Sequence, residues 1–386
     1  MLKDLKTIIS NIKQLGGIKA DLSHLGSTLN MIEIDPTTVC NLRCVMCHNA
    51  TGLAPANFVD MAVIESVRDF SLKSDLNIRV NLTGIGEFLC HPQWRKILTI
   101  LSEGKCDIIF FSNGLLLKEE DIDFIWNDTR VYQLNVSMDA VSEKTYKRIR
   151  RGGDFSKLKQ IVKKISNHNN KRIFALTMCV ISSNAHEMQG FCKYAADIGA
   201  TGVIFQTIHD KEYPSISTKD GYVFDGKGER ISGTELREVL RGCSEILDTY
   251  NLSLSITWPN VPQWLNERDE PTIIRCLKRT KDIEVKYSPD YYTSKGKIVN
   301  MFKQYNLNPK CFYPWTRLSL CNYTREPSWR VCCLSSIDSF LGGKNAALEA
   351  AWNSFKIKKI RQLMLKGKRP KQCLRDLCGI ARELDG

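Results

Sequence analysis

Short apolar segments alternate with amphipathic helical segments throughout residues 29–210. The helical segments repeat apolar residues at spacings of three and four, as in Leu158, Ile161, Val162 and Ile165. Strands that alternate with helices form a parallel sheet, because each helix carries the chain back across the sheet. The strand candidates are residues 29–35, 78–84, 106–112, 132–138, 173–181 and 202–208.

Six such units predict an α/β fold, a partial (β/α)6 TIM-like barrel rather than a complete eight-unit barrel. Residues 252–258 offer a seventh strand after a helix at 234–250, and residues 211–232, rich in Gly, Ser and Pro, predict a long loop. We divide the chain into an N-terminal helix (1–28), the barrel (29–215), a connecting or substrate region (216–305) and a small C-terminal domain (306–386).

The composition is typical of a soluble globular protein. The 386 residues are 43% hydrophobic and 25% charged, and no stretch reaches the ~18 to 20 continuous apolar residues that a membrane helix needs. The first 28 residues resemble an amphipathic helix more than a signal peptide, so we expect a cytoplasmic protein without a membrane partner. In a reducing compartment, 15 cysteines indicate metal or redox chemistry rather than disulfides.

The formal net charge of +13 is interpreted as a solvated, lysine-rich surface. No basic segment is interleaved with aromatic residues in the way that proteins stack nucleobases, so nucleic acid is not an expected partner. An anionic substrate would also suit this charge.

Polar or glycine-rich residues follow every strand candidate. In a parallel barrel the loops after the strands share one face, where enzymes of this architecture build their sites, so we expect these residues to converge. In strand order they are Cys40, Cys44 and Cys47; Gly84, Gly86 and Glu87; Ser112, Asn113 and Gly114; Ser137 and Asp139; Asn184 and Glu187; and His209.

The segment CNLRCVMC places Cys40, Cys44 and Cys47 directly after the first strand. Each thiolate at this spacing can bind one iron of a cubic 4Fe-4S cluster, which normally takes four cysteines. The remaining iron is then open to a small chelating ligand, as a catalytic metal keeps a free position. Structural zinc is the alternative, but zinc takes four ligands, and His48 is poorly placed to supply one because it adjoins Cys47.

CNLRCVMC resembles the CxxxCxxC signature of the radical S-adenosylmethionine (SAM) superfamily, and GIGE at 84–87 is similar to its GGE motif. The resemblance implies a partial barrel, which agrees with the strand count. It also implies that SAM chelates the open iron of a cluster held by the three cysteines, which are the catalytic residues. Reductive cleavage of SAM would yield methionine and a 5′-deoxyadenosyl radical that removes a hydrogen atom from the substrate.

The same resemblance assigns residues to SAM. Met46 stands where the family often has an aromatic residue on the adenine, and its thioether can cover a ring face. Because Ile85 separates the two glycines of GIGE, the match to the GGE motif rests mainly on Gly86 and Glu87. Glu87 with Gly86 is assigned to the amino group, Ser137 and Asp139 to the ribose, and Arg150 to the carboxylate. The full set of cofactor-binding candidates is Met46, Gly84, Gly86, Glu87, Asn113, Ser137, Asp139 and Arg150.

Residues 311–378 resemble a SPASM or shorter twitch domain, which holds an auxiliary iron-sulfur cluster. The likeness lies in a C..PW start, a CC pair, a helix with Trp-Asn and a closing cysteine pair. It implies one auxiliary cluster of the 4Fe-4S type, with Cys321 as a spare ligand candidate. The implied ligands are Cys311, one of Cys332 and Cys333, Cys373, and Cys378.

Four other cysteines are expected to pack in the core: Cys179, Cys192, Cys243 and Cys276. Cys243 shares an apolar helical stripe with Leu236 and Leu247. Cys179 lies in the fifth strand and faces either the barrel interior or the helices. In the first orientation its thiol could donate a hydrogen atom, as in related epimerases.

We expect hydrogen abstraction from a small polar substrate, leading to oxidation or epimerisation, with an electron donor such as flavodoxin or ferredoxin. One motivating feature is the short segment before the first strand, which leaves no space for a leader-binding domain. The other is the compact module from Cys311 to Cys378 with its single implied cluster, which resembles members that act on small polar molecules such as amino sugars. A peptide-modifying maturase is the alternative enzyme. An iron-sulfur electron carrier and a zinc-bearing nucleic-acid-binding protein are the alternatives without this activity.

Overall fold

The structure, a computed structural model, describes residues 29–74, 77–168, 172–207, 215–229, 231, 233–250, 253–257, 317–321, 328–330, 347–365 and 368. Each of the six strands expected between residues 29 and 210 is present, as is the seventh. They are β1 (Met31–Ile34), β2 (Ile78–Leu82), β3 (Cys106–Ser112), β4 (Val131–Ser137), β5 (Ile173–Val180), β6 (Gly202–Thr207) and β9 (Ser253–Thr257).

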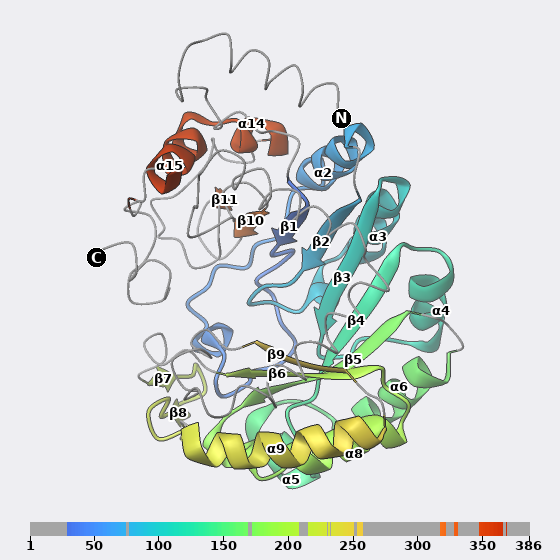
Figure 1. Ribbon diagram of the computed structural model, residues 1–386, viewed down its shortest axis with the longest axis vertical. Coiled ribbons are helices and arrows are strands. Elements are labelled where there is room, and N and C mark those ends of the chain that lie inside the picture. Colours follow the sequence, from blue (N-terminus) through green and yellow to red (C-terminus); the bar gives the residue numbers. More distant parts are fainter. Residues whose placement is uncertain are drawn as a thin grey trace.

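These seven strands are parallel neighbours in the order β1-β2-β3-β4-β5-β6-β9. Figure 1 shows that the sheet curves, so that β5, β6 and β9 run almost across the direction of β2 and β3. The structure therefore confirms the α/β fold class and the partial-barrel architecture.

Helices follow the strands and cover the outer side of the sheet (Figure 1). Several begin at an acidic or hydroxyl residue whose side chain accepts a main-chain N–H, such as Asp60, Ser142 and Asp154. The helices that cover the sheet are α2 (Met61–Lys73), α3 (Trp94–Glu103), α4 (Glu119–Asn127), α5 (Glu143–Ile149), α6 (Phe155–Asn167), α7 (Ser182–Ala185), α8 (Met188–Asp197) and α9 (Gly233–Thr249).

The two faces of the sheet differ in chemistry. Side chains alternate along a strand, and one set belongs to the main hydrophobic core together with the helices, as Val80, Phe110 and Val136 do. The other set lies on the inner face, where polar side chains are mixed with apolar ones such as Ile109 and Ala175. Inner positions include Arg79, Asn81, Gln133, Asn135, Ser137, Thr177 and Cys179.

The predicted long loop at residues 211–232 contains a small hairpin. β7 (Ile216–Ser217) pairs antiparallel with β8 (Val223–Phe224). Ile216 and Phe224 are buried, and they pack with Val45 and Met46 of the cysteine segment. This contact places the hairpin beside the site.

Two strands from the C-terminal region extend the same sheet. β10 (Arg317–Cys321) pairs parallel with β1, and β11 (Ser328–Arg330) pairs antiparallel with β10. The Ser319 hydroxyl donates to Glu33, at 2.7 Å, on the inner face of this pairing.

Two C-terminal helices, α14 (Leu348–Trp352) and α15 (Phe355–Leu365), lie on the same side as α2 (Figure 1). Trp352 and Arg361 are fully buried, and the guanidinium carbon of Arg361 lies 4.3 Å from the centre of the Trp352 ring. On the α2 side, Lys73 forms an ion pair with Glu349.

Within the described residues, no helix combines the length and the apolar character needed to cross a membrane.

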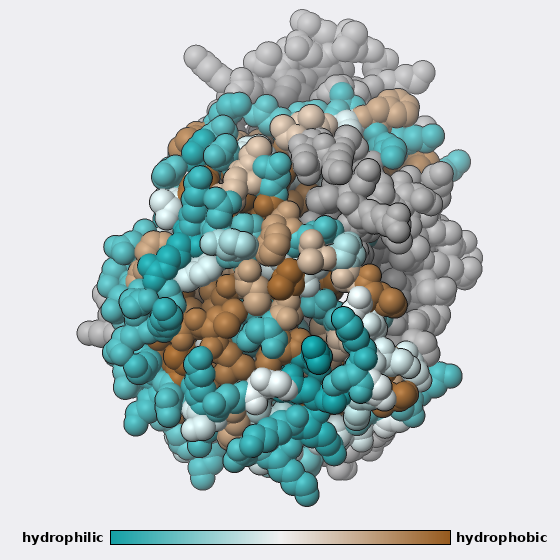
Figure 2. Space-filling model, turned by 180° about the vertical axis from the view of Figure 1, so that it is seen from behind, coloured by the Kyte–Doolittle hydropathy of each residue, from teal (hydrophilic) through white to brown (hydrophobic). Residues whose placement is uncertain are grey.

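Seen from behind, the surface gathers hydrophobic side chains in its middle, with hydrophilic side chains around them (Figure 2).

Trp329→Ala tests whether β10 and β11 are part of the fold that holds β1. Trp329 is 1% exposed and belongs to the main core, so its truncation should lower the free energy of unfolding by about 3–5 kcal/mol. Denaturant unfolding followed by far-UV circular dichroism measures this change. Tyr250→Ala, at a side chain that is half exposed, is the control with little expected effect. Equal stability of the two variants would contradict the packing of β11 on this core.

Candidate active site

The cysteine segment leaves β1 at Ile34 and runs to the short 3-10 helix η3 (His48–Thr51). Leu42, Val45 and Met46 point into apolar surroundings and are at most 8% exposed. Cys40, Cys44 and Cys47 are free thiols that are only partly exposed. The segment therefore anchors itself through its apolar side chains and holds three thiols on one turn.

The loop after β2 packs directly against this segment. The main-chain N–H of Glu87 donates to the carbonyl of Val39, at 2.8 Å. A Cβ on Gly86 would lie 2.0 Å from the carbonyl oxygen of Thr37, and a Cβ on Gly84 would lie 1.9 Å from Oδ1 of Asp35. Both glycines of GIGE are thus needed for the close approach of the two loops.

Glu87 connects this loop to the loop after β3. Its carboxylate is 4% exposed and accepts hydrogen bonds from the Ser112 hydroxyl (2.7 Å), the main-chain N–H of Asn113 (2.7 Å) and that of Leu89 (3.2 Å). Burial raises the pKa of Glu87, although these hydrogen bonds act in the opposite direction. The assignment of Glu87 to the amino group of SAM stays a prediction, and the structure gives the carboxylate three partners within the protein.

Asn113 reaches the cysteine segment itself. Its Nδ2 donates to Oδ1 of Asn41, at 2.8 Å. Asn41 stands between the first two cysteines and was not among the site residues expected from the sequence. The sequence alone does not indicate a role for Asn41, because its partner Asn113 comes from a distant loop that only the tertiary structure brings beside it.

The residues after α5 form the third support. The N–H of Arg43 donates to the carbonyl of Arg151 (3.0 Å), and the N–H of Val45 donates to that of Ile149 (2.9 Å). Arg150 lies between these two carbonyls. The cysteine segment is therefore held by main-chain bonds on both sides, toward GIGE and toward the end of α5.

Asp139 and Arg150 form a buried ion pair beside the thiols, with Nε of Arg150 2.6 Å from Oδ2 of Asp139. The other carboxylate oxygen accepts the N–H of Cys179, at 2.7 Å. Asp139 has φ 61°, a left-handed conformation that Asp tolerates better than most residues. Burial opposes the charge of Arg150, but the Asp139 carboxylate and Cys44 raise its pKa overall.

The ends of β4 and β5 are joined around this pair. Nδ2 of Asn184 donates to the carbonyls of Asp139 and Cys179, both at 2.9 Å. The Thr177 hydroxyl lies 3.1 Å from that of Ser137. Asp139 and Arg150 thus lie beside Cys44, and Ser137 lies beside Thr177 on the inner face; the roles of these residues toward SAM stay predictions.

Met46 is 8% exposed and belongs to a small apolar cluster with Val45, Ile149, Ile181, Ile216 and Phe224. Cys44 and Cys179 pack against this cluster. The position of Met46 beside both thiols is compatible with a role against a bound ring, which stays a prediction.

The three thiols of the segment are suited to a cationic group. Burial raises the pKa of Cys40 to about 12 and that of Cys44 to about 12, and it also raises the pKa of Cys47. A buried thiol ionises when a metal offsets the cost of the thiolate charge. The donor set therefore fits an iron-sulfur cluster.

Among the described residues, no three His, Cys, Asp or Glu side chains converge closely enough to hold one metal ion. A cubic cluster does not require such convergence, because each of its cysteines binds a separate iron. Spaced thiols on one turn are compatible with that arrangement.

The other cysteines named in the sequence analysis differ in where they lie. Cys192 and Cys243 are fully buried, which confirms their expected packing. Cys179 lies on the inner face of β5 and remains partly exposed beside Asp139. Cys321 ends β10, and the predicted auxiliary ligands Cys311, Cys332, Cys333, Cys373 and Cys378 lie outside the described residues, as do Cys276 and His209.

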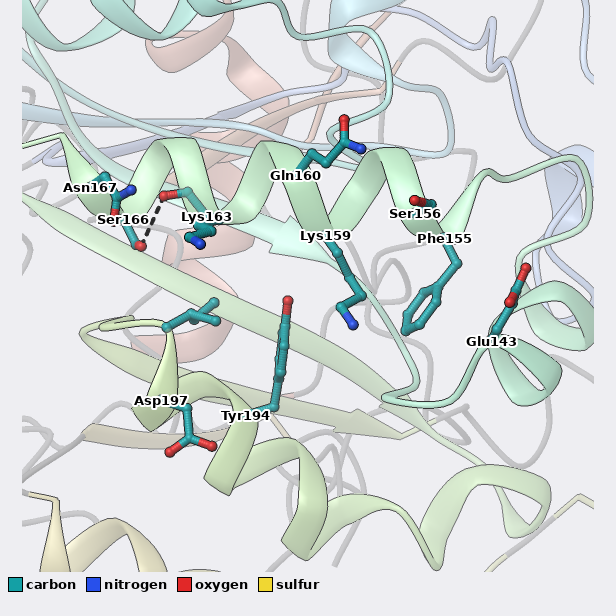
Figure 3. Close-up of a pocket in the computed structure, with 11 residues that line it drawn as sticks. Glu143, Phe155, Ser156, Lys159, Gln160, Lys163, Ser166, Asn167, Tyr194 and Asp197 are labelled. Carbon is teal, nitrogen blue, oxygen red and sulfur yellow. Dashed lines mark hydrogen bonds between the residues drawn. The ribbon is translucent and has the colours of Figure 1, made fainter.

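A groove of about 670 Å³ lies on the outer side of the barrel, between α6 and α8. Figure 3 shows Lys159 and Tyr194 extending toward one another from these two helices, with Glu143 of α5 at one end. None of the predicted cofactor or metal residues lines this groove. It is therefore separate from the cysteine segment.

The comparison with protein families agrees with this geometry. Residues 34–195 match the model of the Radical SAM superfamily. The matched part contains all three cysteines and the loops after β2, β3 and α5 that contact them.

Two curated proteins are similar to parts of the chain. The GTP 3′,8-cyclase of Alkaliphilus oremlandii (strain OhILAs) is 29% identical over 135 residues, which are 34% of this chain and 41% of that protein. The antilisterial bacteriocin subtilosin biosynthesis protein AlbA of Bacillus subtilis (strain 168) is 22% identical over 173 residues, or 44% of this chain and 38% of that protein. The matches thus span about two fifths of the length of these relatives.

Solved structures share the fold over most of the chain. Streptococcus suis SuiB bound to the precursor peptide SuiA has a TM-score of 0.59 at 12% identity, covering 99% of this chain and 74% of that one. The anSMEcpe protein with bound AdoMet has a TM-score of 0.56 at 16% identity, covering 90% and 87%. At these identities the likeness concerns the fold alone.

Gly86→Ala tests the close approach of the two loops. The added Cβ would overlap the carbonyls of Thr37 and Val39, so the cysteine segment must move. We expect several-fold less iron after anaerobic reconstitution, measured as protein-bound iron and sulfide. Gly190→Ala in α8 is the matched control, because its Cβ meets only Val141 at 3.4 Å. Full iron content in Gly86→Ala would show that the contact is dispensable.

Asp139→Asn tests the buried ion pair. The variant keeps the shape of the side chain but leaves the charge of Arg150 buried without its carboxylate, which should cost about 3–5 kcal/mol of unfolding free energy. Denaturant unfolding of the cluster-free protein measures this loss. Glu143→Gln removes one partner of the exposed Glu143–Lys147 pair and should change little. A small effect in Asp139→Asn would mean that water or another group compensates Arg150.

Proposed function

We propose that this chain is a radical SAM enzyme that reductively cleaves SAM and removes a hydrogen atom from a polar substrate. The observation that carries the proposal is the set of three thiols at Cys40, Cys44 and Cys47. They lie on one turn within the radical SAM domain, and neighbouring loops hold that turn on both sides.

The cysteines would hold a 4Fe-4S cluster, which when bound supplies the electron and the open iron that SAM cleavage requires. The chain's own residues position this chemistry. Gly84 and Gly86 allow the loop after β2 to approach, and Glu87 ties it to Asn113. The ion pair of Asp139 and Arg150 sets a fixed charge beside Cys44.

The remaining cofactor assignments belong to the same proposal. Met46 would cover the adenine, Ser137 and Asp139 would contact the ribose, and Arg150 would contact the carboxylate of SAM. An auxiliary cluster on the C-terminal cysteines would accept an electron if the net reaction is an oxidation. A reduced flavodoxin or ferredoxin would supply electrons to the first cluster.

The substrate class has two candidates. The first is a small polar molecule that is oxidised or epimerised, supported by the polar side chains on the inner face of the barrel, such as Gln133, Asn135 and Thr177. The second is a peptide, supported by the solved structure of SuiB with its precursor peptide and of anSMEcpe with the Cp18Cys peptide, whose folds cover most of this chain. The radical SAM domain favours either enzyme over an electron carrier or a zinc protein that binds nucleic acid.

The test is the formation of 5′-deoxyadenosine, measured by mass spectrometry after anaerobic reconstitution, reduction and addition of SAM. The wild-type chain should form it, and the triple variant Cys40→Ala, Cys44→Ala, Cys47→Ala should not. Cys90→Ser, at a partly exposed thiol outside the turn, is the control and should retain formation.

The same assay separates the substrate classes, because a substrate should stimulate turnover. Stimulation by small polar molecules favours the first candidate, and stimulation by peptides favours the second. Absence of 5′-deoxyadenosine from a wild-type protein that has bound iron would overturn the proposal and favour an electron carrier.

A further inference from the structure

The inner face of the barrel carries a buried side-chain amide whose NH2 group has no hydrogen-bond partner. Asn135 of β4 is 0% exposed, and its Nδ2 has no hydrogen-bond partner. Its neighbours along the strand, Leu134 and Val136, belong to the hydrophobic core under the helices. Because side chains alternate along a strand, the Asn135 side chain faces the barrel interior, on the same side as Ser137.

The orientation of this amide is set by a second one. Nε2 of Gln133 donates to Oδ1 of Asn135, at 2.9 Å. This bond occupies the acceptor end of Asn135 and leaves its NH2 group as the available donor. Gln133 therefore fixes which end of Asn135 a bound group would meet.

An acceptor without a partner lies on the same face, two strands away. Oδ1 of Asn81 in β2 is buried and has no hydrogen-bond partner. Asn81 is aligned with Ile109 of β3, and Ile109 is aligned with Gln133 of β4. The inner face thus presents one free donor and one free acceptor across a single intervening strand.

Such an arrangement destabilises the fold unless something pairs with it. Buried polar groups without partners are rare in folded proteins, and barrel interiors are usually filled by branched apolar side chains. A site that pairs its buried polar groups only with the bound molecule rejects molecules that lack the matching groups. The unpaired amides therefore have the character of a recognition site.

We propose that Asn135 and Asn81, aligned by Gln133, form a subsite that binds a neutral amide group of the substrate. The NH2 of Asn135 donates to the carbonyl oxygen of that amide, and Oδ1 of Asn81 accepts its N–H. No charge is required, which suits a carboxamide or peptide group better than a carboxylate. The inference rests on the proposed function, because it names the substrate chemistry of the same barrel.

A neutral amide can belong to a small molecule or to a peptide, so the test uses one probe of each kind. N-acetylalanine methylamide represents a peptide, N-acetylglucosamine represents a small polar molecule, and glucose is the control without an amide. Saturation-transfer NMR titration of the reconstituted, SAM-bound full chain gives the dissociation constant of each probe.

We expect at least one amide probe to bind and glucose not to bind. Asn135→Leu should raise the dissociation constant of that probe at least tenfold. The melting temperature should change little, because the variant removes a buried NH2 group without a partner but also removes the acceptor of the Gln133 hydrogen bond. Asn30→Leu is the matched control, since Asn30 is 3% exposed and its side-chain amide also has no hydrogen-bond partner, but it lies before β1. It should leave probe binding unchanged.

If Asn135→Leu does not fold, Asn81→Leu is measured by the same criterion. The proposal is overturned if neither amide probe binds the wild-type chain, or if the folded variant binds it as the wild type does. Formation of 5′-deoxyadenosine is measured separately on the wild type. Loss of that reaction with retained, Asn135-dependent amide binding would overturn the enzyme proposal and leave the subsite standing.

Discussion

Main-chain hydrogen bonds on both sides of the cysteine segment hold the site together, and they depend on the parallel register of the sheet. Because β1, β2 and β3 run in one direction, the loops that follow them leave at one edge and can bond to one another. Glu87 bonds to Val39 on one side, and Ile149 and Arg151 bond to the segment on the other. A shift of register in any of these strands would separate the thiols from their supports.

Desolvation is the energetic cost of this arrangement. The thiols are buried enough that their ionised form is unfavourable in the protein alone, as the raised pKa of Cys40 and Cys44 indicates. A fixed cation beside them, Arg150, is itself buried and depends on Asp139 for compensation. Formation of the thiolates therefore requires a bound group whose positive charge offsets the cost of burying them.

The inner face of the sheet also buries polar groups at a cost, but these groups are uncharged. The helix-facing positions of the strands carry apolar side chains and supply the core, whereas the inner positions include amides and hydroxyls among apolar side chains. Asn135 is kept without a partner for its NH2 group although an apolar residue there would pack better. An unpaired buried NH2 group lowers the stability of the fold but leaves a donor for a bound molecule, a combination that is common at functional sites.

Local patterns in the sequence determined the strands, the order of the units and the approach of the strand ends. Strand periodicity placed each predicted strand between residues 29 and 210 within two residues of its observed bounds. Buried parallel strands are short apolar segments, so each one can be recognised from its own residues without knowledge of its neighbours. The spacing of Cys40, Cys44 and Cys47 identified the turn, since ligands on one short segment need no knowledge of distant contacts. The stripe on α6 and the burial of Cys243 were predicted for the same reason.

Only the tertiary structure decided which distant residues complete the site. The pairing of β10 with β1 joins segments that are almost 300 positions apart, and no local period encodes such a partner. The bond between Asn41 and Asn113 and the three-way engagement of Glu87 likewise depend on how two loops meet. The inner orientation of Cys179 and the unpaired NH2 group of Asn135 follow from side-chain direction within a curved sheet. The sequence determines that direction only as an alternation, and the curvature of the sheet determines which side becomes the interior.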